Sequence, residues 1–198
     1  MANLILNGST SGSITLAAPA VANTTTLTLP TTSGTVLTSG TSSNFPIGSI
    51  LQVVSTTKTD TFSSATTNAW TDITGLSVSI TPSSASNTIL VMASVQGINT
   101  SSNAYFRLVR GSTGIGVGAT AGSRSSVSSS NITGSGVNSM GGSSFQFLDS
   151  PATTSSTTYK IQFITDVATI YVNRTVNDTD ALYTGRSQST ITVMEIKA

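Results

Sequence analysis

The stretch Thr88-Ile89-Leu90-Val91-Met92-Ala93-Ser94-Val95 is almost continuously apolar, and it decides the class of fold. A run of this length, rich in aliphatic side chains and bounded by turn residues, is typical of a strand in the middle of a sheet. Shortly before it, Leu76-Ser77-Val78-Ser79-Ile80 alternates apolar and polar residues, as a strand with one buried face does. Pro82-Ser83-Ser84 between the two runs predicts a turn. We therefore expect antiparallel sheet built around residues 88–95.

Short strands and turns continue through residues 46–198. Runs bounded by Gly, Pro, Asn and Ser recur there, and no stretch has the apolar spacing of a helix. Residues 111–144, rich in Gly and Ser, are expected to form a long loop or weak edge strands. About eight to ten strands predict an all-β, jelly-roll-like β-sandwich. The other runs expected to form strands are 50–54, 59–62, 69–73, 104–110, 144–148, 159–164, 168–172, 181–183 and 189–196.

Residues 1–45 are predicted to form a separate N-terminal unit. Very short alternating runs at 4–6, 13–16, 26–29 and 35–37 are separated by Gly and Pro. Strands so short cannot enclose a core alone. We therefore expect several copies of the chain to intertwine these segments around a common axis. An unstructured, Ser/Thr-rich leader is the alternative.

The composition argues against catalysis. Ser and Thr make up about a third of the chain, charged residues are only 8%, and His and Cys are absent. Nucleophilic Ser–His and Cys–His pairs are therefore excluded, and Asp178 and Asp180 form the only close carboxylate pair, in a polar loop. We predict a protein that is not an enzyme and binds no cofactor. A Ca²⁺ site at these carboxylates with Asn173 and Asn177 is disfavoured, because the spacing is not that of a calcium loop.

Charge and hydropathy narrow the range of partners. The net charge is +1 and the eight cationic residues are scattered, whereas a nucleic-acid-binding face needs them clustered. No segment approaches the roughly 20 apolar residues of a membrane span, and the N-terminus does not resemble a signal peptide. We therefore predict neither nucleic-acid binding nor membrane insertion. The apolar share of 37% makes a thin core, which favours association of copies.

Three bulky or charged residues outside the loops have two interpretations each. Trp70, the single Trp, is predicted to pack in the core or at a subunit interface rather than to bind a ligand. Arg107 and Arg110 flank an apolar stretch. They either face acidic residues of a neighbouring copy or lie on the free surface.

Two sets of residues carry a likeness to a known family. The first is GSTSGSITLAAPAVA at 8–22 with LTLP at 27–30 and GTVL at 34–37; the second comprises residues 51–54, 58–62, 70–76, 79–82 and 106–112. The first set resembles the N-terminal or repeated module of fibre proteins from tailed bacteriophages, especially marine ones. The second is similar to the C-terminal domain of the same group.

This resemblance implies a homotrimeric protein of the virion. Residues 1–45 would be an attachment or shaft segment that docks on another virion protein of the tail, baseplate or capsid. Residues 46–198 would be a head with a jelly roll of the tumour-necrosis-factor type. The chain is short for a tail fibre, so decoration of the capsid without a receptor function stays open. The residues expected to attach the segment are Leu4, Leu6, Ile14, Leu16, Leu27 and Leu29.

The polar loop near the C-terminus is the predicted contact with the host. Arg and Tyr next to Asn and Asp suit recognition of a surface glycan through planar hydrogen bonds and stacking. A plain solvated loop is the alternative. The residues expected to bind a receptor are Asn173, Arg174, Asp178, Asp180, Tyr183 and Arg186.

Overall fold

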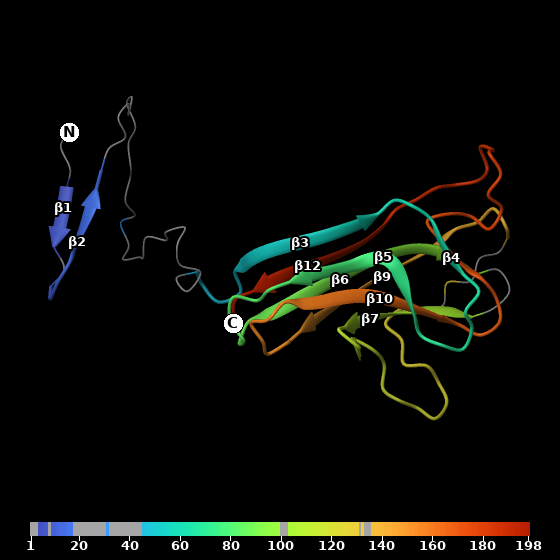
Figure 1. Ribbon diagram of the computed structural model, residues 1–198, viewed down its shortest axis with the longest axis horizontal. Coiled ribbons are helices and arrows are strands. Elements are labelled where there is room, and N and C mark those ends of the chain that lie inside the picture. The colour runs from blue at the N-terminus through green and yellow to red at the C-terminus, as the bar shows by residue number, and fades with distance from the viewer. Residues whose placement is uncertain are drawn as a thin grey trace. The chain divides into compact units, whose positions relative to one another are not determined.

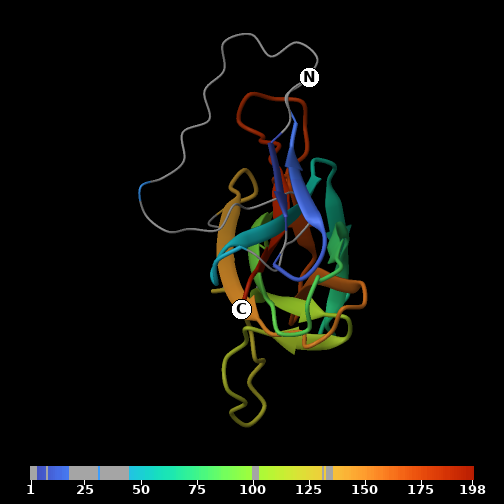
Figure 2. The ribbon, with the colours of Figure 1, turned by 90° about the vertical axis from the view of Figure 1, so that its left-hand side faces the viewer.

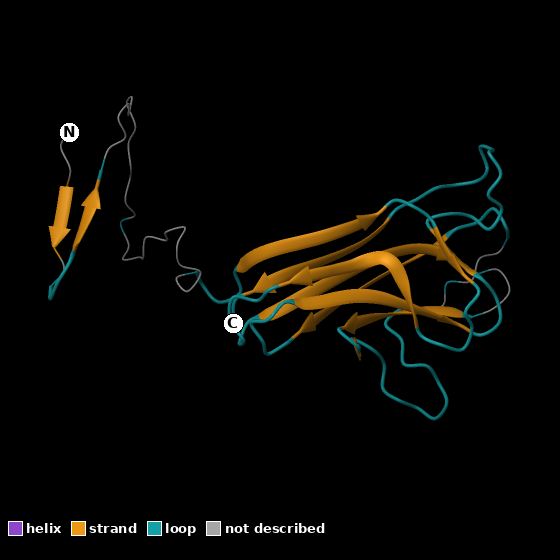
Figure 3. Ribbon diagram, viewed as in Figure 1, coloured by secondary structure: helices purple, strands orange, loops and turns teal. Residues whose placement is uncertain are grey.

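The computed structural model describes residues 4–7, 9–17, 31, 45–99, 103–130, 132 and 136–198. Within these residues every regular element is a β-strand, so the predicted all-β class is confirmed (Figures 1 and 3). Contacts divide the chain into two units, Met1–Val36 and Leu37–Ala198. The predicted boundary after residue 45 stays a prediction.

The first unit contains one antiparallel hairpin. Strand β1 (Leu4–Asn7) pairs with β2 (Ser13–Leu16), and Leu4 lies opposite Leu16. Ile5 and Leu6 are each more than half exposed. The described part of this unit therefore leaves apolar side chains uncovered. Outside the described part lie Leu27 and Leu29, the predicted strands at 26–29 and 35–37, and the side chains of Leu4, Ile14 and Leu16.

The second unit is a sandwich of two antiparallel sheets that face each other as layers (Figures 1 and 2). One sheet has the order β5-β10-β7-β8; the other has the order β3-β12-β6, with β9 on the far side of β6 and the short β11 and β4 in the same sheet. The strands are β3 (Ile50–Lys58), β4 (Phe62–Ser64), β5 (Thr71–Ile80), β6 (Thr88–Ile98), β7 (Ala104–Arg110), β8 (Thr113–Ile115), β9 (Gly141–Asp149), β10 (Thr157–Thr165), β11 (Ile170–Val172) and β12 (Ser189–Ile196).

The strand order is that of a jelly roll. If β3, β5, β6, β7, β8, β9, β10 and β12 are numbered one to eight in chain order, the sheets run 1-8-3-6 and 2-7-4-5. Residues 88–95, predicted to be central, lie in β6, which pairs with β12 and β11 on one side and with β9 on the other. The predicted jelly-roll sandwich is thus confirmed.

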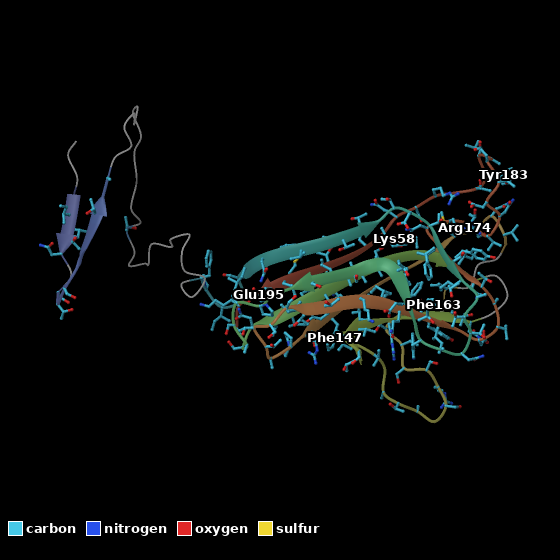
Figure 4. The ribbon with its side chains drawn as sticks, viewed as in Figure 1. Lys58, Phe147, Phe163, Arg174, Tyr183 and Glu195 are labelled. Atoms are coloured by element: carbon cyan, nitrogen blue, oxygen red, sulfur yellow. The ribbon has the colours of Figure 1, made fainter. Side chains whose placement is uncertain are left out.

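The core lies between the sheets because alternate residues of each strand point inward. In β6 the inward set is Ile89, Val91, Ala93 and Val95, all buried. Phe163 of β10, labelled in Figure 4, is fully buried. Its ring meets that of Phe62 edge to face, with centroids 6.0 Å apart. Burying a side chain of this size contributes about 1.5–3 kcal/mol.

Four segments differ from the sequence-based predictions. Residues 59–61, expected to be part of a strand, connect β3 to β4 instead. The predicted strands 69–73 and 76–80 form one strand, β5, which begins at Thr71 and continues through a bulge at Gly75, where φ is +83°. Residues 181–183, expected to be a strand, form turns instead. In the predicted long loop, Ser129 Oγ accepts from the amide of Phe106 (2.7 Å) and Ser128 Oγ from that of Leu108 (3.1 Å). These hydroxyls take the place of a neighbouring strand along part of β7.

A buried charge cluster links the two sheets. The carboxylate of Asp149 on β9 accepts hydrogen bonds from Arg110 on β7 (2.8 and 2.9 Å) and from the hydroxyl of Tyr159 on β10 (2.7 Å). Burial, together with the hydrogen bond to Asp149, raises the pKa of Tyr159 far above its ordinary range. Arg110 therefore has its acidic partner within its own chain.

A second buried carboxylate holds the end of the sandwich at which the chain enters. Glu195 is fully buried and accepts hydrogen bonds from Gln52 (2.6 Å), Asn87 (2.6 Å) and both the amide and hydroxyl of Ser83 (2.7 Å each). Burial raises the pKa of Glu195, but these four hydrogen bonds lower it by more, so that the net shift is downward. The backbone of Lys197 also pairs with Gly48 and Ser49. The C-terminal strand and the entering chain are therefore tied together here.

We predict that Gly116→Ala destabilises the fold more than Gly111→Ala. Both glycines have φ near +60°, but an added Cβ at Gly116 would lie 2.8 Å from Phe147, whereas at Gly111 it meets no atom within 4 Å. The overpacking adds about 1–3 kcal/mol to the backbone strain that both variants share. Urea unfolding measures the difference in the free energy of unfolding. Equal losses for the two variants would contradict the close approach of Phe147, on β9, to Gly116.

We also predict that Glu195 contributes stability that is lost in acid. Because its folded pKa lies below the unfolded value of 4.5, the contribution is present above that pH and disappears as the pH falls through the folded pKa. The difference in melting temperature between the wild type and Glu195→Gln should therefore shrink between about pH 6 and about pH 3. A difference that is constant over this range would show that the carboxylate charge plays no part.

Candidate functional site

The residues predicted to bind a receptor, 173–186, lie in the connection between β11 and β12, residues 173–188, which leaves the sandwich at Asn173. Asn173 has φ +62° and is fully buried. Its side-chain Nδ2 donates to the carbonyls of Lys58 (2.8 Å) and Asp60 (3.0 Å), and its Oδ1 accepts from the hydroxyl of Ser189 (2.6 Å). Asn173 therefore anchors the base of the loop to β3 and β12. This corrects its expected role as a surface contact, because no part of its side chain reaches the solvent.

An ion-pair bridge closes the loop above this anchor. Asp178 accepts from Arg174 through Oδ2 (2.6 Å) and from Arg186 through Oδ1 (2.7 Å). Arg174 and Arg186 also face each other in an antiparallel backbone bridge. The guanidinium of Arg174 lies over the ring of Tyr171, 4.6 Å from its centroid. Three residues predicted to act together are thus in direct contact, and Tyr171 supports them from β11.

The tip of the loop presents apolar side chains beside a polar hollow. Leu182 is fully exposed and Tyr183 is 62% exposed. The hydroxyl of Thr184 donates to the carbonyls of Thr179 (2.6 Å) and Ala181 (2.8 Å), which shapes the turn. A hollow of about 300 Å³ lies beside the tip, lined by Asp178, Thr179, Asp180, Ala181, Thr184 and Arg186.

Sequence reasoning found most of this loop but not all of it. Leu182 and Thr184 were not predicted, although an apolar residue next to Tyr183 in a polar loop was a usable signal. The contribution of Tyr171 depends on tertiary structure. In the described residues no group of three acidic, His or Cys side chains is placed to hold a metal ion. The loop offers planar hydrogen-bonding groups, an exposed phenol and an apolar tip, which are groups for recognition.

A second candidate surface is the outer face of the sheet that contains β6. Its register brings Val53, Met194, Leu90 and Leu148 side by side in one row across four strands. The next two rows, farther from the chain entry, consist of Ser and Thr with Met92 and Gln146, and part of this area forms a hollow of about 510 Å³. Along these four strands no charged side chain lies on the outer face.

The outer face of the other sheet, β5-β10-β7-β8, is different because it carries charged side chains that pair with one another. Lys160 pairs with Asp72 (2.7 Å), and Gln162 donates to the same carboxylate (2.7 Å). Arg107 donates to Gln162 (2.7 and 3.0 Å) and stacks on Trp70, 4.1 Å from the ring centroid. Trp70 is thus half-buried under an arginine of its own chain on the outer face and is not in the core. The two faces of the sandwich differ sharply in charge.

Comparisons with known proteins give no family. No protein-family model matches the chain, and no curated protein matches it. A solved structure described as that of infectious bursal disease virus, Gx strain, is similar over 84% of this chain and 47% of that chain, with 13% identity and a TM-score of 0.37. This chain thus spans about half the length of that viral chain. The described residues contain no helix long and apolar enough to cross a membrane.

We predict that Asp178→Ala loosens the loop without unfolding the head. Removing both ion pairs at a partly exposed carboxylate should cost no more than about 1 kcal/mol of global stability. Amides of residues 174–186 should nevertheless exchange faster in hydrogen–deuterium exchange with mass-spectrometric detection. Asp180→Ala, a matched change in the same loop, should leave exchange unaltered; identical profiles for the two variants would contradict the bridging role of Asp178.

Proposed function

We propose that this protein is a structural, non-enzymatic component of a virion that assembles as a homotrimer, attaches by its N-terminal segment and contacts the host surface with its head. The observation that carries the proposal is the uncharged outer face of the sheet β3-β12-β6-β9. A soluble domain normally covers an exposed antiparallel face with polar and charged residues. A charge-free face with an apolar row is instead the composition of the centre of a subunit interface.

Second copies of this chain are the partner proposed for that face. The net charge of +1 means that identical copies repel each other little when they approach. Exposed Ile5 and Leu6 in the N-terminal hairpin give the copies further apolar surface to share. Burial of such surface contributes about 25 cal/mol per Å² and would supplement the thin core of a single chain. The other sheet, with its ion pairs, would remain outside.

The placement of the chain ends supports attachment at one end and recognition at the other. Residues 45–49 and the C-terminus lie at the end of the sandwich marked by Glu195, whereas Tyr183 lies at the opposite end (Figure 4). A head fixed by its N-terminal segment would therefore present the loop 173–188 away from the attachment point. Three identical loops give three weak contacts whose combined avidity exceeds that of one.

A capsid-decorating protein is the second candidate for the virion role. In that case the head needs no receptor function, and the loop 173–188 is a solvated turn. Gold-labelled antibody against the head, viewed on intact virions by electron microscopy, separates the two. Label on the tail supports the fibre role, label on the shell supports decoration, and virions that carry no label contradict both.

We predict that Val53→Lys splits the trimer. A charge in the apolar row would lie buried between copies without a partner, which costs several kcal/mol per subunit. Light scattering after size exclusion should give three chain masses for the wild type and one for Val53→Lys. Ser79→Lys, on the sheet whose outer face already carries charged side chains, is the matched control and should stay trimeric. A wild type that has the mass of one chain at micromolar concentration would contradict the trimer.

A further inference from the structure

A small hollow at the end of the head opposite the chain entry is a separate candidate binding site. It has a volume of about 190 Å³ and lies where β10 ends, beside the start of β7 and the turn before β5. Polar side chains and one aromatic ring line it: Asn68, Asn103, Tyr105, Ser125 and Asp166, with Ile164 and Thr165. None of these residues belongs to the loop 173–188. The geometry points to a site for one neutral sugar ring.

The floor of the hollow suits the apolar face of a pyranose. Tyr105 on β7 lies directly opposite Ile164 on β10 in the sheet register. Both side chains are half-buried, so an aromatic ring and an aliphatic chain lie next to each other in the lining. Aromatic side chains with a polar end combine apolar contact with hydrogen bonding. A pocket of this volume is smaller than those that hold drug-sized ligands, which favours one ring over a chain of sugars.

The rim offers the hydrogen-bonding groups that sugar hydroxyls require. Asp166 is exposed, and its carboxylate accepts a long hydrogen bond from Asn103 (3.4 Å). The side-chain Nδ2 of Asn68 donates to the carbonyl of Asp166 (3.1 Å), and the backbone amide of Asn68 donates to the carbonyl of Thr165 (2.7 Å). The backbone that carries the carboxylate is therefore fixed before a ligand arrives, which reduces the entropy lost on binding.

The charge of the residues that line the hollow determines whether a neutral or an anionic sugar binds better. Among the described residues that line the hollow, Asp166 is the one ionisable carboxylate and there is no Lys or Arg. The nearest arginine along β7, Arg107, is occupied by Gln162 and Trp70. A carboxylate or sulfate on the sugar would thus meet the negative charge of Asp166 without a cation in the described lining, since Arg124, next to Ser125 in the chain, donates to the carbonyl of Ala121 instead. The site is therefore expected to prefer neutral glycosides over uronates. This inference does not depend on the trimer or on the virion location.

Saturation-transfer NMR on the full chain tests the site. The probes are the methyl glycosides of glucose, galactose and mannose, with methyl glucuronide as an anionic probe that differs from the glucoside at one carbon. At least one neutral glycoside should receive saturation, with a Kd of about 1 mM or weaker for so open a site. The glucuronide should receive much less. Asp166→Ala should weaken binding at least about tenfold, because a hydrogen bond to a charged group is lost.

Asp72→Ala removes an exposed carboxylate that lies outside both the hollow and the loop 173–188, so it is the control and should leave the signal unchanged. Loss of the signal in Asp180→Ala but not in Asp166→Ala would place the sugar in that loop and overturn the assignment to the hollow. No saturation of any neutral glycoside, or equal saturation of the glucuronide, would overturn the inference as well. None of these outcomes bears on the proposed trimer, which light scattering on the wild-type protein tests independently.

Discussion

Pairing of β6 with β12 on one side and with β9 on the other fixes the direction of the side chains of these three strands. The register sends Ile89, Val91, Ala93 and Val95 into the core. It sends Leu90 and Met92 to the opposite face, in line with residues of the three neighbouring strands. The core and the uncharged outer face are therefore two consequences of one register. A slip of one residue would exchange them, so neither face can change without the other.

The abundance of Ser and Thr has a structural use in this sandwich. Hydroxyls of Ser128 and Ser129 satisfy amides of β7 at and beyond the point where β8 ends beside it. Ser189 does the same for Gln96 in the gap between β12 and β11. Short side chains that accept a backbone hydrogen bond let strands end and begin without leaving buried donors unpaired. A chain with few charges can in this way still satisfy its backbone.

The strands whose apolar and polar residues alternate regularly could be predicted from the sequence. Features that depend on contacts between residues far apart in the chain could not. Residues 104–110 and 189–196 are strands with the predicted bounds, because their apolar pattern is regular. Residues 69–73 and 76–80 were predicted to be two strands, yet a left-handed glycine in a bulge, Gly75, lets one strand continue. Asn173 was expected at the surface because it is polar and follows a strand. Its burial depends on carbonyls of β3 and the turn after it, more than a hundred residues earlier, which no local pattern reveals.

Hydroxyl-radical footprinting of the methionines tests the central claim, that copies of the chain meet on the uncharged face. Met194 and Met92 lie on that face, whereas Met140 lies near Gly185 in the loop region and serves as an internal reference. If the account is right, oxidation of Met194 and Met92 relative to Met140 falls as the protein concentration rises through the association range. Ratios that stay the same from dilute to concentrated protein would contradict it.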